Sequence, residues 1–322
     1  MHSYSLIASA KINLYLEIVS DRPDGYHELV MVLQSIDLAD QIDLRPLGTD
    51  AIYLHCNHPE VPQDHRNLAY KAAALMAEKF PNTFAKYGGV EIAIDKRIPV
   101  GAGLAGGSTN AAAVLVGLNM MWNLGLSIRE LQCLGALLGS DVPFCIVGGT
   151  MVATGRGERL SPLPVLDNLY VVLGKYRSLS VSTAWAYQTF RYQYLDSIVS
   201  DAFAIENRKQ RPYAGQMVSA IACQNKRQIG QLLHNDLERV VLPKYHKVQQ
   251  LKDEFQRLGC AGMMSGSGPT VFALTKSQQE AQQVLEAVKT TIPDPDLDLW
   301  VSKLTDTSIR ITSSNKPTFN FN

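Results

Sequence analysis

Residues 99–115 read PVGAGLAGGSTNAAAVL. Glycine and alanine fill all but one of positions 101–107, and a serine, three alanines and long apolar residues follow. Ser108 is a favourable N-cap and Gly125 a favourable stop, so we expect a helix over 108–124. Glycines let backbone N–H groups approach a ligand, and a helix N-terminus adds unpaired N–H groups and partial positive charge. The stretch therefore predicts an anion site, most often one for phosphate.

Two familiar phosphate loops fit this stretch poorly. Gly101, Gly103 and Gly106 satisfy G-x-G-x-x-G, but residues 96–99 separate the loop from the preceding strand, and no acidic residue stands at a strand end about 20 positions later. In the P-loop pattern, Gly107 stands where the phosphate-binding lysine is required. A protein kinase would need an HRD segment, which the sequence lacks. A nicotinamide-dependent enzyme is therefore a weak alternative.

The composition is that of a globular protein with a balanced charge. The 322 residues are 46% hydrophobic and 19% charged, with 30 basic and 30 acidic side chains. Length suggests one large or two ordinary domains, and nothing global indicates nucleic acid or a membrane. The five cysteines form no CxxC pair, and the segment 55–58, HCNH, lacks metal-ligand spacing. We expect a cytoplasmic protein, because the N-terminus is typical of a strand rather than a leader and no apolar stretch is long enough to span a membrane.

Hydrophobic periodicity predicts an α+β chain. In the first strand, Lys11 and Asn13 alternate with the apolar positions 12, 14, 16 and 18. Predicted strands cover residues 6–18, 28–36, 40–47, 51–56, 90–94, 169–175, 270–275 and 299–305. Predicted helices cover residues 67–79, 108–124, 127–139, 183–196, 213–223, 226–235, 244–258 and 279–290. The basic stretch 207–211 is expected to be a solvated surface.

The boundary between two domains is predicted within residues 155–168. This segment combines two glycines, two prolines and mixed charge between apolar segments. The resulting division is an N-terminal domain over 1–160 that contains the glycine loop, a C-terminal domain over 161–305 and a flexible tail over 306–322.

Three segments together resemble one superfamily of small-molecule kinases. PVGAGLAGGSTNAAA resembles the P-x-x-x-G-L-x-x-S-S-x-A loop of the GHMP kinases, which are related to galactokinase, homoserine kinase and mevalonate kinase. Residues 9–29 and 262–274 resemble their N-terminal and C-terminal glycine-rich motifs, in the same order over nearly the whole chain. The resemblance implies a two-domain α+β fold with a ribosomal-protein-S5-like N-terminal domain and a ferredoxin-like C-terminal domain. It also implies ATP under the loop, Mg²⁺ on the ATP phosphates and an acceptor between the domains.

The loop departs slightly from the superfamily pattern. Ala102 and Ala105 replace glycines, and Thr109 replaces a serine. Alanine still permits close approach to a nucleotide where φ is negative, so we expect nucleotide binding to be kept.

A narrower resemblance concerns the acceptor. Lys11-x-Asn13-Leu14, DGYH at 24–27, DKRIP at 95–99 and GSDVPF at 139–144 are similar to one branch of the superfamily. That branch transfers the γ-phosphate of ATP to the 2-hydroxyl of 4-diphosphocytidyl-2-C-methyl-D-erythritol in the non-mevalonate (methylerythritol phosphate) pathway of isoprenoid precursor biosynthesis. We expect a monomer or weak homodimer that needs neither nucleic acid nor a membrane.

The resemblance implies a role for individual residues. Asp141 matches the catalytic aspartate, a base for the acceptor hydroxyl, although it also suits a helix N-cap before Pro143. Lys11 matches the second catalytic position, either keeping Asp141 ionised or stabilising the transferred phosphoryl group. Asn13 would orient the substrate. The positions that match the ATP site are Pro99, Val100, Gly101, Ala102, Gly103, Leu104, Ala105, Gly106, Gly107, Ser108 and Thr109, with Asn67 and Lys96 near the base.

The acceptor's cytosine suits aromatic side chains. Tyr26 and His27 match substrate-binding positions, and Tyr187 matches a ring that forms the second face of a cytosine sandwich. If the register slips, Trp185 takes that place instead. Two other functions stay open: a kinase for a different small alcohol, and a non-catalytic ATP-binding regulator. Retention of Lys11 and Asp141 argues against the regulator.

Overall fold

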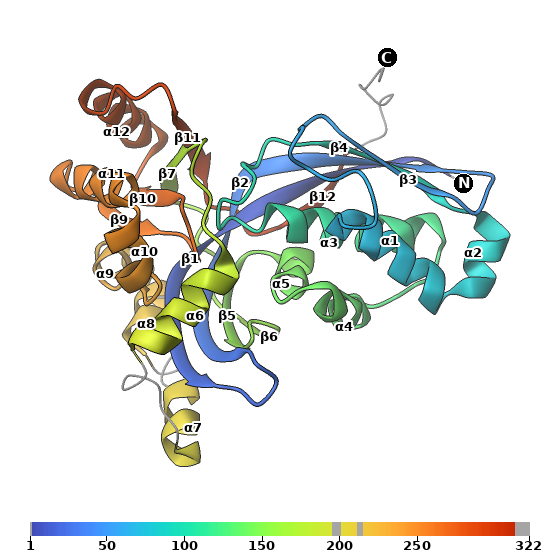
Figure 1. Ribbon diagram of the computed structural model, residues 1–322, viewed down its shortest axis with the longest axis horizontal. Helices are drawn as coiled ribbons and strands as arrows, with labels where there is room; N and C mark the ends of the chain where they lie inside the picture. The colour runs from blue at the N-terminus through green and yellow to red at the C-terminus, as the bar shows by residue number, and fades with distance from the viewer. Residues whose placement is uncertain (1, 195–200, 211–214, 313–322) are drawn as a thin grey trace.

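Two β-sheets organise the chain (Figure 1). The structure, a computed structural model, describes residues 2–194, 201–210 and 215–312. In that part of the chain the first sheet has the order β12-β1-β2-β4-β3, with β5 and β6 continuing from β2 and β8 pairing with β1. Its strands are β1 (Tyr4–Asp21), β2 (His27–Pro46), β3 (Ile52–Cys56), β4 (Val90–Asp95), β5 (Thr150–Gly155), β6 (Arg159–Pro162), β8 (His234–Asn235) and β12 (Ile309–Thr312).

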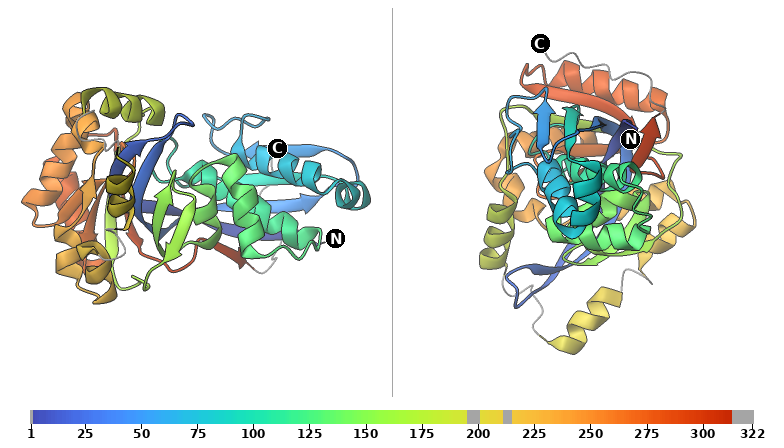
Figure 2. Two further views of the ribbon diagram at one scale, coloured as in Figure 1. Left: turned by 90° about the horizontal axis from the view of Figure 1, so that it is seen from below. Right: turned by 90° about the vertical axis from the view of Figure 1, so that its right-hand side faces the viewer.

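Helices cover one face of the first sheet (Figures 1 and 2). They are α1 (Leu68–Lys79), α2 (Pro81–Tyr87), α3 (Gly106–Met121), α4 (Ile128–Leu138) and α5 (Val142–Val147). The alanine-rich α3 is buried on nearly every side, between β1 and β2 on one side and α1, α4 and α5 on the other. The capping box predicted at the start of α4 is confirmed: the Ser127 hydroxyl accepts from the Glu130 N–H, and the Glu130 carboxylate accepts from the Ser127 N–H.

The second sheet is antiparallel, in the order β11-β7-β10-β9. Its strands are β7 (Tyr170–Tyr176), β9 (Ala261–Met264), β10 (Val271–Thr275) and β11 (Leu297–Lys303). Helices lie between β7 and β9 and between β10 and β11, which gives the βαββαβ order of a ferredoxin-like domain. The helices are α6 (Thr183–Gln193), α7 (Ala202–Gln210), α8 (Gln216–Ala222), α9 (Lys226–Gln231), α10 (Glu238–Lys244), α11 (His246–Arg257) and α12 (Gln278–Thr291). No helix of the described residues is long and apolar enough to cross a membrane.

Several predicted boundaries were wrong. The strands predicted at 28–36 and 40–47 form the single strand β2, in which an irregularity beside Ser9 and Lys11 of β1 absorbs the polar interval. The helix predicted over 244–258 is α11, and the preceding α10, with Pro243 inside it, was missed. Residues 207–210 belong to α7, which projects from the body (Figures 1 and 2). Residues 195–196, 211 and 213–214 of the predicted segments lie outside the described residues.

The predicted alternation of β1 also fails at one place. A bulge between Asn13 and Tyr15 inserts a residue, so the side chains on either side of it change faces. As a result Leu16 lies on the cavity side with Lys11 and Asn13, whereas Leu14 packs in the core between the sheets.

The chain crosses between the sheets more than once. β6 closes the first sheet at Pro162 and β7 opens the second at Tyr170, close to the predicted boundary. β8 and β12 then return to pair with β1. The expectation of a flexible tail from 306 was therefore wrong for Ile309–Thr312, whose backbone joins the sheet; residues 313–322 lie outside the described residues.

The start of α3 differs from the prediction. The helix begins at Gly106 rather than after a Ser108 cap, and Ala105 occupies the N-cap position with φ 58° and ψ 28°. The expected negative φ is thus wrong at Ala105, because the chain enters the helix through a left-handed residue. Ser108 lies in the first helical turn, without a capping role.

We predict that Ala105→Gly stabilises the protein slightly. The left-handed conformation costs an alanine about 1–2 kcal/mol, and the substitution removes this strain. Glycine loses more conformational freedom on folding, which offsets about 0.5–1 kcal/mol of the gain. Thermal or urea denaturation should show a net gain of up to about 1 kcal/mol. Ala102→Gly is the matched control, since Ala102 is buried and has no positive φ; it should destabilise. Equal losses in both variants would contradict the strain at Ala105.

Candidate active site

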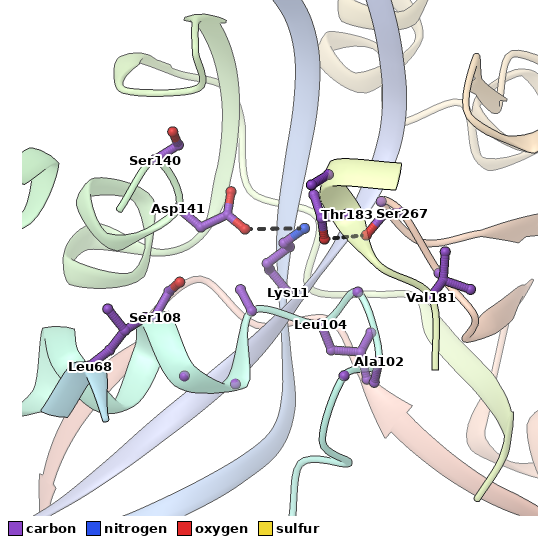
Figure 3. A pocket seen from close by; sticks show the side chains of 18 of the residues that line it. Lys11, Leu68, Ala102, Leu104, Ser108, Ser140, Asp141, Val181, Thr183 and Ser267 are labelled. Atoms are coloured by element: carbon purple, nitrogen blue, oxygen red, sulfur yellow. Dashed lines mark hydrogen bonds and ion pairs between the residues drawn. The ribbon is translucent and has the colours of Figure 1, made fainter. Parts of the chain in front are cut away.

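One cavity of about 770 Å³ lies between the two halves of the molecule (Figure 3). Its walls come from β1, the hairpin to β2, the glycine loop with the start of α3, the start of α6 and the loop after β9. It brings together predicted residues that are far apart in sequence, namely Lys11, Asn13, Tyr26, His27, Asn67, Lys96, the loop 99–108, Asp141 and Tyr187. Thr109 does not line the cavity but is fully buried behind it, and Trp185 does not line it either.

Two glycine-rich loops interlock at the cavity wall. The Ser265 hydroxyl donates to the Gly103 carbonyl at 3.1 Å, and the Lys11 N–H donates to the Leu104 carbonyl at 3.1 Å. Gly103 has φ +74°, and a Cβ there would lie 2.2 Å from the Ser265 carbonyl oxygen. Position 103 therefore requires glycine for both backbone conformation and space.

The N-terminus of α3 opens into the cavity. Gly106, Gly107 and Ser108 line it, and the first N–H groups of a helix have no intrahelical partner. A Cβ at Gly106 would lie 2.7 Å from Lys96 Nζ, whereas one at Gly107 would meet only Leu68 Cδ1, at 3.7 Å. Packing within the protein therefore explains why position 106 is glycine. It does not explain glycine at position 107, which is exposed towards the cavity. These features are typical of an anion site.

A buried carboxylate that the sequence analysis missed holds this wall in place. Asp40 is fully buried and forms an ion pair with Lys96. It also accepts from the Arg97 N–H at 2.7 Å, the Ile98 N–H at 2.8 Å and the Asn110 amide at 2.7 Å. The charge of Lys96 is therefore already balanced within the protein. In the sequence Asp40 is one of several acidic residues in a strand, and nothing marks it out.

Lys11 and Asp141 face each other across the floor of the cavity (Figure 3). Lys11 Nζ donates to Asn13 Oδ1 at 2.7 Å and lies 3.7 Å from Asp141 Oδ2. Lys11 is only 5% exposed, whereas the Asp141 side chain is 33% exposed to the cavity. Asp141 stands at the N-cap position of α5, before Pro143, but its side chain makes no capping hydrogen bond. Its carboxylate is therefore held in place by the helix start and remains available to a ligand.

The loop after β9 closes over this pair. A Cβ at Gly266 would lie 3.3 Å from Asn13 Oδ1 and 3.4 Å from Lys11 Nζ. Asn235 of β8 holds the loop, since its amide donates to the carbonyls of Met264 and Gly266 at 2.7 and 2.8 Å. Asn235 was not predicted as a site residue, because it lies outside the motifs recognised in the sequence.

A second link joins α6 to the same loop. The hydroxyls of Thr183 and Ser267 are 2.8 Å apart and hydrogen-bonded (Figure 3). Ser267 lies inside the glycine-rich segment 262–274 and Thr183 inside the segment 180–187, but the sequence singled out neither residue.

Aromatic side chains form the other end of the cavity. The rings of His27 and Tyr187 stack with centroids 5.2 Å apart and an interplanar angle of 20°. Trp185 instead packs edge-on against Tyr245, with Lys244 Nζ 4.0 Å from its ring centroid. The structure thus brings Tyr187, not Trp185, to the cavity. Because His27 and Tyr187 are in direct contact, no base fits between these two rings as they stand.

Burial changes the titration of both stacked residues. It lowers the pKa of His27 although the Asp21 carboxylate, 3.0 Å away, acts in the opposite direction. The imidazole is therefore neutral at pH 7. Burial likewise raises the pKa of the Tyr187 hydroxyl, which stays protonated. Tyr26 is more open, 52% exposed, with the Arg156 guanidinium 4.7 Å from its ring centroid.

Comparison with known proteins agrees with this geometry. The model of the GHMP kinases N-terminal domain matches residues 67–149, and that of the GHMP kinases C-terminal domain matches residues 217–294. The 4-diphosphocytidyl-2-C-methyl-D-erythritol kinase of Nostoc punctiforme is 61% identical over 316 residues, covering 98% of this chain and all of the relative. The one of Trichormus variabilis is 59% identical over 313 residues, covering 97% and 99%.

Two solved structures are similar to this chain, one in sequence and fold and the other in fold alone. A crystal structure of 4-(cytidine 5'-diphospho)-2C-methyl-D-erythritol kinase superposes with a TM-score of 0.71 at 30% identity, covering 93% of this chain and 98% of the other. Homoserine kinase from Cytophaga hutchinsonii superposes with a TM-score of 0.73 at 19% identity, covering 97% and 98%, and shows the shared fold alone. With relatives this similar over their full length, the chain belongs to the 4-diphosphocytidyl-2-C-methyl-D-erythritol kinases of the GHMP kinase superfamily.

Proposed function

We propose that this cavity is where the kinase transfers the γ-phosphoryl group of ATP to the 2-hydroxyl of 4-diphosphocytidyl-2-C-methyl-D-erythritol, in the non-mevalonate pathway. The products are the 2-phosphate and ADP. The observation that carries the proposal is that the Lys11–Asp141 pair and the N-terminus of α3 line one cavity. Phosphoryl transfer depends mainly on positioning and charge stabilisation, and this arrangement supplies both.

The nucleotide occupies the half of the cavity under the glycine loop. Its phosphates lie against the free N–H groups at the start of α3, with the Ser108 hydroxyl on the same turn. Asn67 and Lys96 border this half: Asn67 caps α1, and Lys96 is fixed by Asp40. Thr109 contributes by packing behind the loop rather than by contact, because its side chain is fully buried.

Asp141 accepts the proton of the 2-hydroxyl as that oxygen attacks the γ-phosphorus. Its partial exposure to the cavity and its freedom from a capping bond leave a lone pair for this hydrogen bond. Lys11, 3.7 Å away, places positive charge beside the carboxylate and beside the transferred group. Asn13 fixes the ammonium of Lys11 through its carbonyl and so orients the pair.

The cytosine lies at the aromatic end of the cavity. Tyr187 offers a ring face there, and Tyr26 lines the same end from the hairpin. Since His27 is neutral, its imidazole has one N–H donor and one ring-nitrogen acceptor for the polar edge of the base. Tyr26 and Tyr187 are then the two faces of the cytosine site, with His27 at its edge.

Mg²⁺ is expected on the ATP phosphates. Asp141 and the Ser108 hydroxyl are oxygen donors that line the cavity, and the described residues contain no group of three or more histidine, cysteine or acidic side chains placed to hold a metal. Such a sparse donor set fits Mg²⁺, which keeps several waters and uses few protein ligands. The ion supplies charge neutralisation on the phosphates when bound.

We also propose that the enzyme works in the cytoplasm as a monomer or weak homodimer, without nucleic acid. Five free cysteines suit a reducing compartment, and the zero net charge gives no general attraction for a polyanion.

Asp141→Asn should lower kcat about 10²- to 10⁴-fold, because the carboxamide keeps the shape but cannot accept the proton. The assay is ADP release from ATP and Mg²⁺ with 4-diphosphocytidyl-2-C-methyl-D-erythritol as acceptor. ATP affinity and the melting temperature should stay near those of the wild type. Undiminished turnover in the variant would refute the role of Asp141. Wild-type enzyme that binds ATP without turnover would instead favour another alcohol acceptor or a regulator.

Gly107→Ala should increase the stability of the protein and weaken its binding of ATP. The added methyl meets only an ordinary contact within the protein and favours the helix by about 0.5–1 kcal/mol. It also projects where the phosphates approach, so the KM for ATP should rise about tenfold or more. Melting curves and steady-state kinetics measure the two effects. An unchanged KM for ATP would place the phosphates elsewhere.

Tyr187→Ala should raise the KM for the acceptor about tenfold or more, since base–aromatic stacking contributes about 1–3 kcal/mol. Tyr187→Phe keeps the ring and should stay near the wild type. Trp185→Ala is the control: it should lower the melting temperature through its contact with Tyr245 but leave the KM unchanged. The opposite outcome for Trp185 and Tyr187 would assign the second face to Trp185.

A further inference from the structure

The backbone of the loop after β9 lies directly against the ammonium of Lys11. A Cβ added at Gly266 would come within 3.4 Å of Lys11 Nζ and 3.3 Å of Asn13 Oδ1. Lys11 is only 5% exposed, so its ammonium is held in a closely packed space of which this loop forms one side. A shift of the loop would therefore change the direction in which the ammonium points relative to Asp141.

One buried side chain, that of Asn235, binds this loop on both sides of Ser265. Its amide nitrogen donates to the carbonyl of Met264 at 2.7 Å and to that of Gly266 at 2.8 Å. Its amide oxygen accepts from the Leu237 N–H at 3.0 Å. These bonds use both N–H donors and the oxygen of the amide, a combination that neither an aspartate nor a serine of similar size supplies. The position therefore requires asparagine for its hydrogen bonds rather than for its volume.

The backbone of the same residue is fixed on the strand that carries Lys11. Asn235 of β8 pairs with Leu16 of β1. The next residue, Asp236, donates its N–H to the Leu16 carbonyl at 3.0 Å, and its carboxylate accepts from the Ile18 N–H at 2.8 Å. Asn235 therefore ties the strand that carries the ammonium to the loop that packs against it.

We propose that Asn235 is a positioning residue for phosphoryl transfer, which holds the loop after β9 against Lys11 so that the ammonium stays directed at Asp141. The inference rests on the role of Lys11 given under Proposed function. Asn235 does not line the cavity, so its effect on the reaction passes through the loop and the lysine. A displacement of about 1 Å at reacting groups can lower a rate about 100-fold, which sets the size of the expected effect.

The first test removes the two N–H donors of Asn235 at nearly constant size. In Asn235→Asp a carboxylate would face the carbonyl oxygens of Met264 and Gly266, so the loop would be released. We expect kcat to fall about 10- to 100-fold, while the KM values for ATP and for the acceptor stay within about threefold, because neither substrate touches this residue. Asn235→Ala removes the donors without adding charge and gives the same readout if the aspartate variant does not fold.

A double-mutant cycle with Lys11→Met tests whether Asn235 acts through the lysine. The assay is ADP release from saturating ATP, Mg²⁺ and 4-diphosphocytidyl-2-C-methyl-D-erythritol. Asn235→Ala should lower kcat at least about tenfold when Lys11 is present and less than about threefold in the Lys11→Met background. A purely structural role predicts the same loss in both backgrounds, because damage to the fold does not depend on the ammonium.

His234→Ala is the matched control on the same strand. The His234 ring lies next to the ring of Tyr15, with centroids 5.2 Å apart, and its Nε2 is 3.0 Å from the Asp236 carboxylate. Within the described part of the chain it has no hydrogen bond to the loop after β9. The variant should lower the melting temperature through these lost contacts, while kcat stays within about threefold of the wild type.

Several results would overturn the inference. An equal loss of kcat in both backgrounds, or in His234→Ala, would mean that Asn235 supports only the fold. Unchanged kcat in Asn235→Ala would mean that the loop keeps its place without this side chain. These results leave the proposed function intact, since wild-type turnover is unaffected. Wild-type turnover in Lys11→Met would instead refute the role of Lys11 given under Proposed function, and the inference with it.

Discussion

The strand β1 is the element on which both the fold and the site depend. Its backbone pairs with β2, β8 and β12, and the Lys11 N–H holds the glycine loop through Leu104. Ile12 and Leu14 pack in the apolar core shared with the second sheet, while Lys11 and Asn13 face the cavity. A single strand thus joins the two halves and carries Lys11, proposed above as a catalytic residue, at their junction. Moving one half relative to the other would disturb the ammonium directly.

The two buried lysines of the site each require a nearby carboxylate. Burying an ammonium is costly unless it is paired and hydrogen-bonded. Lys11 and Lys96 are both about 5% exposed at the side chain, and each has its own carboxylate. The two pairs differ in the accessibility of that carboxylate. Asp40 is fully buried and satisfied by four donors, so its role is structural, whereas Asp141 keeps one side open to the cavity, as the proposed role as a base requires.

Much of the fold followed from periodicity and capping. The helices α1, α4 and α12 lie within a residue or two of their predictions, since caps at Asn67, Ser127 and Ser277 are local hydrogen bonds. The predictions were wrong where contacts with other segments determine the backbone conformation. Ser108 does not cap α3, because the chain enters the helix through the left-handed Ala105, two residues after Gly103 packs against the loop after β9. The bulge in β1 and the return of β12 depend on pairing across the sheet, which a single segment does not reveal.

The motifs were enough to predict the class of protein and most of the candidate site, because glycine density before a helix and the order of motifs can be read from the chain alone. Which polar residues are partners depends on the folded packing: Lys96 pairs with Asp40, Asn235 with the loop at Met264 and Gly266, and Thr183 with Ser267. Packing also brings Tyr187 rather than Trp185 to the cavity. Such pairings depend on distances between segments far apart in the chain, which are set by packing and leave no mark in either segment alone.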